Sequence, residues 1–258
     1  MKKTFFFFLM LLIPISTFAR DNLIQNADSG ILIEATSGKI LYEKNKDKRV
    51  SVASMTKMVA QIIILEEIEN KKIHWDDIVT VSRNASDMGG SQIYLEEGEK
   101  MSVEDLMKGI SVASGNDATV AMAEYISGSE EKFVERMNQK AKKLGLKHTH
   151  FMNCTGLDED NHYSSSYDMA LIARELVLKH PDILRFSSIY EDYLREDTER
   201  KFWLVNTNKL IRQYDGVDGL KTGHTDRAGY CLAATAKRNN LRFIAIVLGE
   251  NDSKVRNA

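Results

Sequence analysis

Hydrophobic and polar positions divide the chain into an apolar leader, a short strand-like region, a helical middle and a strand-rich end. Two short apolar stretches, at 30–34 and 39–43, flank the sequence Ala-Thr-Ser-Gly, and this arrangement predicts a β-hairpin. From 54 to 69 the apolar residues cover most of a helical surface rather than one stripe. That pattern predicts a helix buried on most of its sides.

The middle of the chain has the apolar spacing of amphipathic helices. The predicted helices cover residues 103–112, 117–127, 130–144 and 167–179. Ser102 fits an N-cap of the first of them, and Gly145 fits the C-terminal stop of the third.

Strand-like patterns return towards the end of the chain. The predicted strands cover residues 219–221, 229–236 and 241–248, with a turn at 237–240. Strands at both ends of a chain with helices between them predict an α+β fold. We expect the first and last strands to share one antiparallel sheet.

The first nineteen residues predict a secretory signal peptide. Lys2 and Lys3 precede an apolar run over 5–15, and small residues at 17 and 19 favour cleavage after Ala19. A membrane anchor is the alternative, but the run is shorter than the roughly 20 apolar residues that a transmembrane helix needs. We therefore expect an exported protein.

Composition narrows the classes of partner. The 258 residues are 43% hydrophobic and 28% charged, which suits one or two folded domains. The net charge of -2 and the absence of a basic run with interleaved aromatics argue against a nucleic-acid partner. Cys154 and Cys231 are predicted to be free thiols, although an exported protein could join them. His148 and His150 have no third ligand at metal spacing, so we expect no metal site.

The first of three short motifs is Ser-Met-Thr-Lys at 54–57. Its spacing puts Ser54 and Lys57 on one face of a helix, one turn apart. A serine needs a nearby base to act as a nucleophile, and lysine serves as that base when burial or a second cation keeps it neutral. The apolar helix supplies burial, and Lys221 is a candidate for the second cation. This spacing alone is common by chance in helices.

The second motif, Ser-Gly-Asn at 114–116, interrupts two predicted helices. Taken alone, Ser114 and Asn116 are more simply explained as caps of the second helix. In a catalytic interpretation, Ser114 passes a proton between Lys57 and a leaving amine. Asn116 then donates to a substrate carbonyl or holds Lys57 in place.

The third motif lies at the head of the closing strands and contains the candidate substrate-binding residues Lys221, Thr222, Gly223, His224 and Thr225. Lys221 is suited to hold a carboxylate, and the two threonines add hydroxyl donors. Gly223 has no side chain, so a peptide would be able to pair closely with the strand edge. The backbone N–H groups near His224 and at Ser54 are candidates for an oxyanion hole. The alternative is an ordinary turn that enters an edge strand.

In this order, the motifs resemble those of the serine-type D-alanyl-D-alanine carboxypeptidases, a family of low-molecular-mass penicillin-binding proteins. The similarity extends over residues 29–256. It is carried by Met-Gly-Gly-Ser-Gln at 88–92, Gly-Asn-Asp-Ala at 115–118, His-Tyr-Ser-Ser at 162–165 and Gly-Leu-Lys-Thr-Gly-His-Thr at 219–225. Such extended agreement is far more specific than any one motif.

The resemblance implies a DD-peptidase/β-lactamase-like fold, in which helices pack on an antiparallel sheet and the active site lies in a cleft beside a helical lobe. It implies that Ser54 is the acyl-enzyme nucleophile, with Lys57 as its proton acceptor. Ser114 and Asn116 complete the catalytic group, and Lys221 binds the substrate carboxylate. The implied substrates are peptidoglycan stem peptides, in cell wall biogenesis, and β-lactams are the implied acylating inhibitors. No metal or organic cofactor is implied.

The sequence departs from the family at its end. Family members continue into a C-terminal helix that packs on the sheet, and many add a β-rich domain and a membrane anchor. Residues 253–258 resemble only the start of that helix. We therefore expect a signal peptide at 1–19 and a catalytic domain at 20–258 with one apolar sheet face uncovered. The expected location is the periplasm or cell wall, and membrane association stays open.

Three other functions remain open, namely β-lactamase, DD-endopeptidase and non-catalytic penicillin-binding sensor. Between residues 150 and 180 no glutamate is followed four residues later by an asparagine, which is the deacylation signature of serine β-lactamases with this fold. Its absence disfavours the first alternative. A sensor usually belongs to a membrane receptor, and the lack of a second apolar run of spanning length disfavours it.

Overall fold

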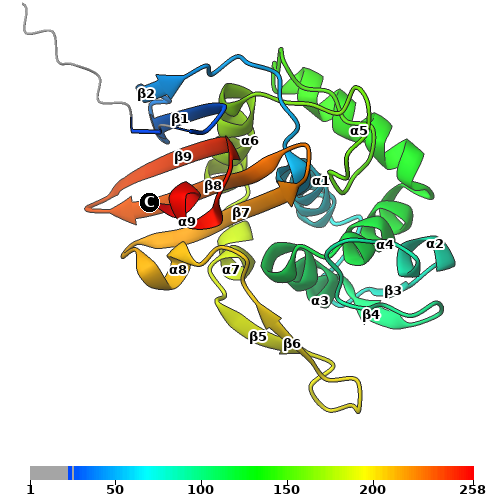
Figure 1. Cartoon of the computed structure of the whole chain (residues 1–258). Helices are drawn as coiled ribbons and strands as arrows, with labels where there is room; N and C mark the ends of the chain where they lie inside the picture. The colour runs from blue at the N-terminus through cyan, green and yellow to red at the C-terminus, as the bar shows by residue number, and fades with distance from the viewer. Residues whose placement is uncertain (1–22, 25) are drawn as a thin grey trace, which may run out of the picture.

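A computed structural model describes residues 23, 24 and 26–258, so the predicted signal peptide lies outside the described residues. Strands from both ends of the chain form one five-stranded antiparallel sheet, as the sequence predicts (Figure 1). In spatial order its strands are β2 (Ile40–Lys44), β1 (Ser29–Glu34), β9 (Leu241–Glu250), β8 (Gly229–Arg238) and β7 (Val217–Thr225). The strand with the third motif, β7, therefore lies at an edge of the sheet.

The first and last strands are joined by a continuous ladder. β1 pairs with β9 from Ser29 opposite Leu248 to Glu34 opposite Phe243. The predicted hairpin is observed as β1 and β2, and the predicted turn at 237–240 joins β8 to β9. Asn239 and Asn240 both have positive φ there, a conformation that asparagine tolerates better than most residues.

Two long helices form the centre of the molecule. α6 (Ser166–Lys179) packs on β1 and β9, and α1 (Lys57–Glu69) packs on α6 and on the helices beyond it. Every residue of α1 from Lys57 to Leu65 is buried, as the apolar pattern predicts. Its first turn continues the 3-10 helix η1 (Ala53–Thr56), which lies against β7. The motif at 54–57 is therefore anchored in the hydrophobic core.

A second group of elements forms a helical lobe beside α1 (Figure 1). It consists of α2 (Arg83–Ser86), α3 (Val103–Lys108), the π-helical segment η2 (Gly109–Ala113), α4 (Asn116–Ser127), α5 (Glu130–Lys143) and the small sheet β3 (Ile78–Thr80) with β4 (Lys100–Ser102). The predicted cap is present, because Ser102 Oγ accepts a hydrogen bond from Asp105 N–H. The helix predicted over 103–112 changes to π-helical geometry at Gly109 and ends at Ser114.

The elements between α6 and β7 are α7 (Ile183–Ser187), the hairpin β5 (Glu191–Leu194) and β6 (Phe202–Val205), and α8 (Leu210–Gln213). The last helix, α9 (Ser253–Asn257), follows β9 and packs on β8 and β9. The hairpin projects away from the sheet beside the lobe (Figure 1). Among the described residues, no helix has the length and apolar character needed to cross a membrane.

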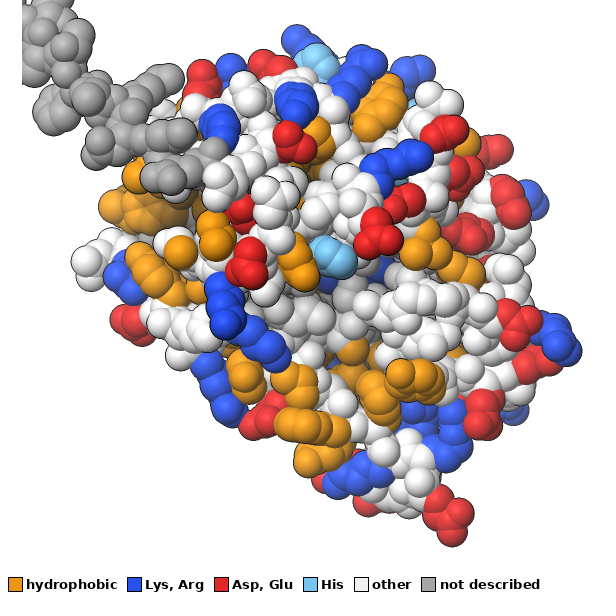
Figure 2. Space-filling view, in the orientation of Figure 1, with side chains coloured by type: hydrophobic (Ala, Val, Ile, Leu, Met, Phe, Trp, Pro, Cys, Tyr) orange, Lys and Arg blue, Asp and Glu red, His pale blue; other side chains and the backbone are white. Residues whose placement is uncertain are grey.

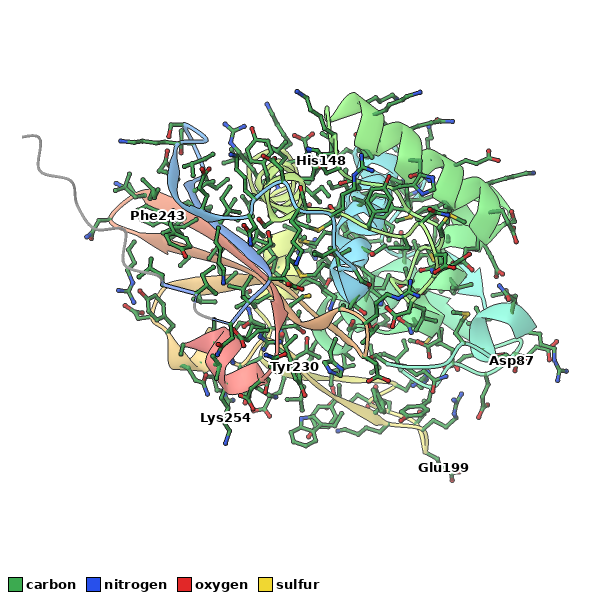
Figure 3. All side chains as sticks on the ribbon, turned by 45° about the horizontal axis from the view of Figure 1, so that its top comes forward. Asp87, His148, Glu199, Tyr230, Phe243 and Lys254 are labelled. Atoms are coloured by element: carbon green, nitrogen blue, oxygen red, sulfur yellow. The ribbon has the colours of Figure 1, made fainter. Side chains whose placement is uncertain are left out.

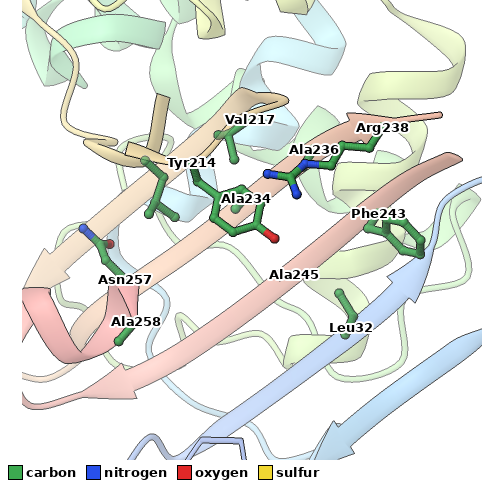
Figure 4. A pocket seen from close by; sticks show the side chains of 11 residues that line it. Leu32, Tyr214, Val217, Ala234, Ala236, Arg238, Phe243, Ala245, Asn257 and Ala258 are labelled. Atoms are coloured by element: carbon green, nitrogen blue, oxygen red, sulfur yellow. The ribbon is translucent and has the colours of Figure 1, made fainter. Parts of the chain in front are cut away.

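The face of the sheet opposite α6 carries an apolar groove of about 520 Å³. Leu32, Ala234 and Phe243 are among its lining residues, and Figure 4 shows Asn257 and Ala258 at one side of it. It lies away from the three motifs, so the site chemistry has to be sought on the other side of β7.

Candidate active site

The predicted nucleophile and its predicted base lie at the junction of η1 and α1. Ser54 is half-buried in η1, and Lys57 is the first residue of α1 and fully buried. One helical turn separates them, and Lys57 Nζ lies 2.8 Å from Ser54 Oγ. The spacing predicted from sequence therefore brings the two reactive atoms within hydrogen-bonding distance.

Lys57 Nζ has two further oxygen neighbours. It lies 2.6 Å from Asn116 Oδ1 and 2.7 Å from the carbonyl oxygen of Thr155. Burial lowers the pKa of Lys57 to about 7, while the nearby Cys154 and Asp117 act in the opposite direction. Since the ordinary pKa of lysine lies above 10, burial brings this amine into the range in which it can accept a proton at neutral pH.

The second motif lies on the lobe side of Lys57 and contacts it through Asn116. Ser114 has a φ of 64°, in the left-handed region, and its Oγ is buried without a hydrogen-bond partner among the described residues. Buried hydroxyls are usually paired, so this group is available to a bound substrate. Asn116 is fixed by its backbone N–H to Ser91 O and by its side-chain amide to Gly89 O, both at 2.7 Å. Its other side-chain atom, Oδ1, is thereby directed at Lys57.

The third motif brings a second buried lysine close to the first. Lys221 in β7 is 1% exposed, and its Nζ donates to the carbonyl of Thr222 at 2.8 Å. Burial lowers the pKa of Lys221 well below its ordinary value, and the charges of Lys57 and Arg256 lower it further. We expected Lys221 to lower the pKa of Lys57. At Lys57 the main cause of the lowered pKa is burial. The repulsion between the two lysines lowers the pKa of Lys221 instead.

Gly223 packs closely against the segment that carries Ser54. A Cβ atom at this position would lie 3.0 Å from Ser54 N, 3.0 Å from Val52 O and 3.0 Å from Ala53 Cβ. The predicted reason, access for a peptide, is therefore joined by a second one, which is close packing of β7 against η1.

The other residues of the third motif already have partners. The Thr222 hydroxyl donates to Thr207 Oγ1 at 2.7 Å. The Thr225 hydroxyl donates to Asp158 Oδ1, also at 2.7 Å. His224 is exposed, and its ring lies 4.2 Å from the ring of Tyr230 at the start of β8, which Figure 3 labels. In the space-filling view of Figure 2, a histidine lies near the middle of the face turned towards the viewer, beside recessed Lys or Arg side chains.

Several residues of the site have no motif to announce them. Thr155 contributes a backbone carbonyl, which any residue type carries. Arg256 is 8% exposed in α9 and donates to Cys231 O at 3.3 Å, so its charge reaches Lys221 from a distant part of the sequence. Asp117 directly follows Asn116, and its buried carboxylate accepts backbone N–H groups of the segment at 93–95. Only Asp117 had a sequence signal, its place within the Gly-Asn-Asp-Ala stretch.

The polar groups gathered at this site are serine hydroxyls, lysine amines and amides. Within the described part of the chain, no group of three or more His, Cys, Asp or Glu side chains is arranged to hold a metal ion. Cys154 and Cys231 are buried free thiols. Burial raises the pKa of both thiols, which does not suit either of them to act as a thiolate nucleophile.

Comparison with known proteins points to one family. The family model described as D-alanyl-D-alanine carboxypeptidase, Peptidase S11, matches residues 17–252. D-alanyl-D-alanine carboxypeptidase DacF of Bacillus subtilis is 57% identical over 236 residues, covering 92% of this chain and 60% of the relative. D-alanyl-D-alanine carboxypeptidase DacA of Escherichia coli K12 is 41% identical over 240 residues, covering 90% of this chain and 58% of the relative. The chain thus spans about 60% of the length of these curated relatives.

A solved structure agrees with the fold. Penicillin-binding protein D2 of Listeria monocytogenes, in its ampicillin-bound form, superposes with a TM-score of 0.80 at 32% identity. The match covers 90% of this chain and 93% of the Listeria chain. The predicted α+β architecture of a DD-peptidase is therefore confirmed. This chain belongs to the Peptidase S11 family of D-alanyl-D-alanine carboxypeptidases.

Proposed function

We propose that the protein is a serine carboxypeptidase that removes the terminal D-alanine from peptidoglycan stem pentapeptides. The observation that carries this proposal is the buried Lys57 amine, which lies 2.8 Å from Ser54 Oγ and has a pKa lowered to about 7. The family assignment supplies the substrate class.

Acylation uses the pair of Ser54 and Lys57. The neutral Lys57 amine takes the proton from Ser54 Oγ, and this oxygen attacks the carbonyl carbon of the penultimate D-alanine. Negative charge develops on the carbonyl oxygen, and the backbone N–H groups of Ser54 and His224 are the proposed donors to it. Such a donor typically contributes about 3–4 kcal/mol to catalysis. Asn116 and the Thr155 carbonyl hold the amine in place during this transfer.

The second motif supplies the route by which the leaving amine is protonated. As the peptide C–N bond breaks, the proton held by Lys57 passes through the Ser114 hydroxyl to the amine of the terminal D-alanine. The unpartnered Ser114 Oγ supports this role, because no protein group competes for it among the described residues. A water molecule then attacks the ester, Lys57 takes its proton, and Ser54 is regenerated with release of the shortened peptide.

Substrate selection depends on two buried basic residues at β7, Lys221 in the strand and Arg256 in α9. Lys221 and Arg256 are both buried, and no salt bridge to either cation is found among the described residues. A carboxylate that enters beside Thr222 would restore the pKa of Lys221 and keep it protonated. This explains a preference for peptides that end in a free carboxylate. The edge position of β7 supports pairing of the substrate as an added strand.

We also propose the setting of this activity. Residues 20–258 would form the catalytic domain, exported by the leader at 1–19 and working in the cell wall or periplasm. Peptidoglycan stem peptides are the proposed substrates and β-lactams the proposed acylating inhibitors, as the ampicillin-bound form of the Listeria protein supports.

The test is to incubate the protein with a labelled penicillin and locate the adduct by peptide mass spectrometry. The expected adduct lies on Ser54, and D-alanine is released from a pentapeptide at a rate that Ser54→Ala abolishes. A stable adduct on another residue, or none in a folded sample, would contradict the assignment. Rapid turnover of penicillin would favour a β-lactamase, cleavage of crosslinked muropeptides an endopeptidase, and acylation without peptide hydrolysis a sensor.

A further inference from the structure

A segment of the lobe forms a strap, residues 89–95, between the second motif and the β5–β6 hairpin. On one side the strap contacts Asn116, which donates to the carbonyls of Gly89 and Ser91. The neighbouring Asp117 carboxylate accepts the N–H groups of Ile93 and Leu95 at 3.0–3.1 Å. The strap is therefore in direct contact with the residue that holds Lys57.

On its other side the strap is held by two arginines from the end of the hairpin. Arg195 donates to Ile93 O at 3.1 Å and to Tyr94 O at 3.4 Å. Arg200 donates to Tyr94 O at 2.7 Å. Glu199, labelled in Figure 3, marks the tip of this connection between β5 and β6.

Both guanidinium groups converge on one carboxylate. Glu99 accepts from Arg195 Nε, from Arg195 Nη2 at 3.3 Å and from Arg200 Nη1 at 2.9 Å. The side chains of Arg195 and Glu99 are only 7% and 12% exposed. Burial alone would raise the pKa of Glu99, but the hydrogen bonds from the arginines hold it below its ordinary value. The cluster is thus a charged clamp (Arg195, Arg200 and Glu99).

The hydrogen bonds of the clamp fix the position of the strap more than they add to the overall stability of the fold. An exposed ion pair contributes little, whereas a guanidinium that reaches a carboxylate and two carbonyls at once fixes the geometry of all three. Tyr94 has a φ of 57°, and its carbonyl is bound by both arginines. Together the arginines and Asp117 bind the backbone of the strap from both sides. The strap therefore cannot shift without moving Asn116.

We propose that Arg195 and Arg200 are positioning residues, which hold Asn116 against Lys57 through the strap and so set the rate of Ser54 acylation. The inference rests on the proposed function, since acylation is what it modulates. It places a determinant of the reaction on a hairpin that, among the described residues, forms no side-chain hydrogen bond to Ser54 or Lys57.

The main test is the double variant Arg195→Met with Glu99→Leu, which removes both buried charges together, while Arg200 keeps Glu96 as an ion-pair partner at 3.1 Å. We expect the second-order rate constant of acylation by penicillin to fall about tenfold, because small displacements of positioned groups are costly. With a pentapeptide substrate, kcat should fall while KM stays within about twofold, since uniform binding is not lost. Hydrogen exchange at the amides of Ile93 and Leu95 should become faster.

Two further variants keep the test decisive. Arg200 is 37% exposed, so Arg200→Gln should fold normally, and it should lower the acylation rate about twofold to threefold by removing one of the contacts to the strap. Arg212→Gln is the matched control, because Arg212 pairs with Glu191 at 2.7 Å on the same hairpin without contacting the strap. It should leave acylation and amide exchange unchanged.

The proposal is overturned if the folded double variant is acylated at the normal rate, or, should it not fold, if Arg200→Gln has no effect. Equal losses in Arg200→Gln and Arg212→Gln would also overturn it, because they would show a general effect of the hairpin. A lack of acylation in the unaltered protein would instead contradict the proposed function. In that case unchanged exchange at Ile93 and Leu95 in the variants would still overturn the clamp.

Discussion

The start of α1 and the edge strand β7 each bring one buried lysine to the same site, but the two lysines have different surroundings. Lys57 has three oxygen neighbours within 2.8 Å, and burial sets its pKa near 7. Lys221 donates to one backbone carbonyl and faces the charges of Lys57 and Arg256. The first surroundings suit an amine that exchanges a proton. In the second surroundings the lowered pKa would rise again when an anion enters, so we propose that Lys221 becomes the cation that binds a substrate carboxylate. In this proposal one residue type serves two purposes, which burial and neighbouring charges decide.

The largest expected effect comes from removing the base. Lys57→Met replaces the amine with an uncharged side chain of similar length and leaves Ser54 without a proton acceptor. The acylation rate should fall by about 10²- to 10⁴-fold, the usual contribution of general base catalysis. Stopped-flow measurement with a fluorescent penicillin provides the rate, and thermal unfolding checks the fold. A variant that reacts within threefold of the normal rate would show that Lys57 is not the base.

A second prediction concerns pH. The base is the neutral amine, so acylation should rise with pH through the Lys57 pKa of about 7 and level off above it. Below that value the rate should fall about tenfold per pH unit, because the neutral fraction falls tenfold. Rates measured from pH 5 to 10 check this. A rate that still increases tenfold per pH unit at pH 9 would mean that Lys57 has an ordinary pKa. Its surroundings would then not make it the base.

Removing the other lysine should have a smaller and more selective effect. Lys221→Met should raise KM for a pentapeptide and lower kcat/KM by about 10- to 100-fold, as a lost hydrogen bond to a charged group is worth about 1.5–3 kcal/mol. A substrate with a C-terminal carboxamide is the control, since it carries no charge for Lys221 to bind. The variant should process this control substrate as well as the unaltered protein does. An equal loss on both substrates would place Lys221 in the chemistry instead.

The smallest of these effects concerns the contact between the two regions. Gly223→Ala puts a methyl group 3.0 Å from Ser54 N and Val52 O, so β7 and η1 must move apart. The free energy of unfolding should fall by about 1–3 kcal/mol, which is typical of overpacking. Urea denaturation measures this loss, and Gly89→Ala, which meets no atom within 4 Å, is the matched control. An undiminished stability of Gly223→Ala would mean that the two regions are not tightly packed.

The sequence predicted the parts of the fold and site that depend on local pattern. The fully buried α1 follows from its apolar residues, and Ser54 and Lys57 meet because helical geometry fixes their separation. The order of the motifs and the wider resemblance identified Ser114, Asn116 and Lys221 as further members of the site. What the sequence left out is carried by contacts between distant segments. The Thr155 carbonyl and the Arg256 charge have no local signature, because a backbone oxygen is common to all residues and α9 reaches Lys221 only through the folded sheet.

The reasons for individual residues were harder to predict than their presence. Gly223 was expected to admit a peptide, yet its nearest neighbours are atoms of the nucleophile segment. Thr225 was expected to offer a donor to substrate, and in the structure its hydroxyl donates to Asp158. Both contacts join segments that are far apart in sequence and side by side in the fold.

The most direct test of the contrast between the two lysines is a titration of Lys57 itself. Lysine labelled with 13C at Cε allows its pKa to be followed by NMR in the free protein, and Lys57→Met identifies the resonance. The structure predicts a midpoint near pH 7 for Lys57. A midpoint near 10.5, the ordinary value for lysine, would contradict the assignment of Lys57 as the base that activates Ser54.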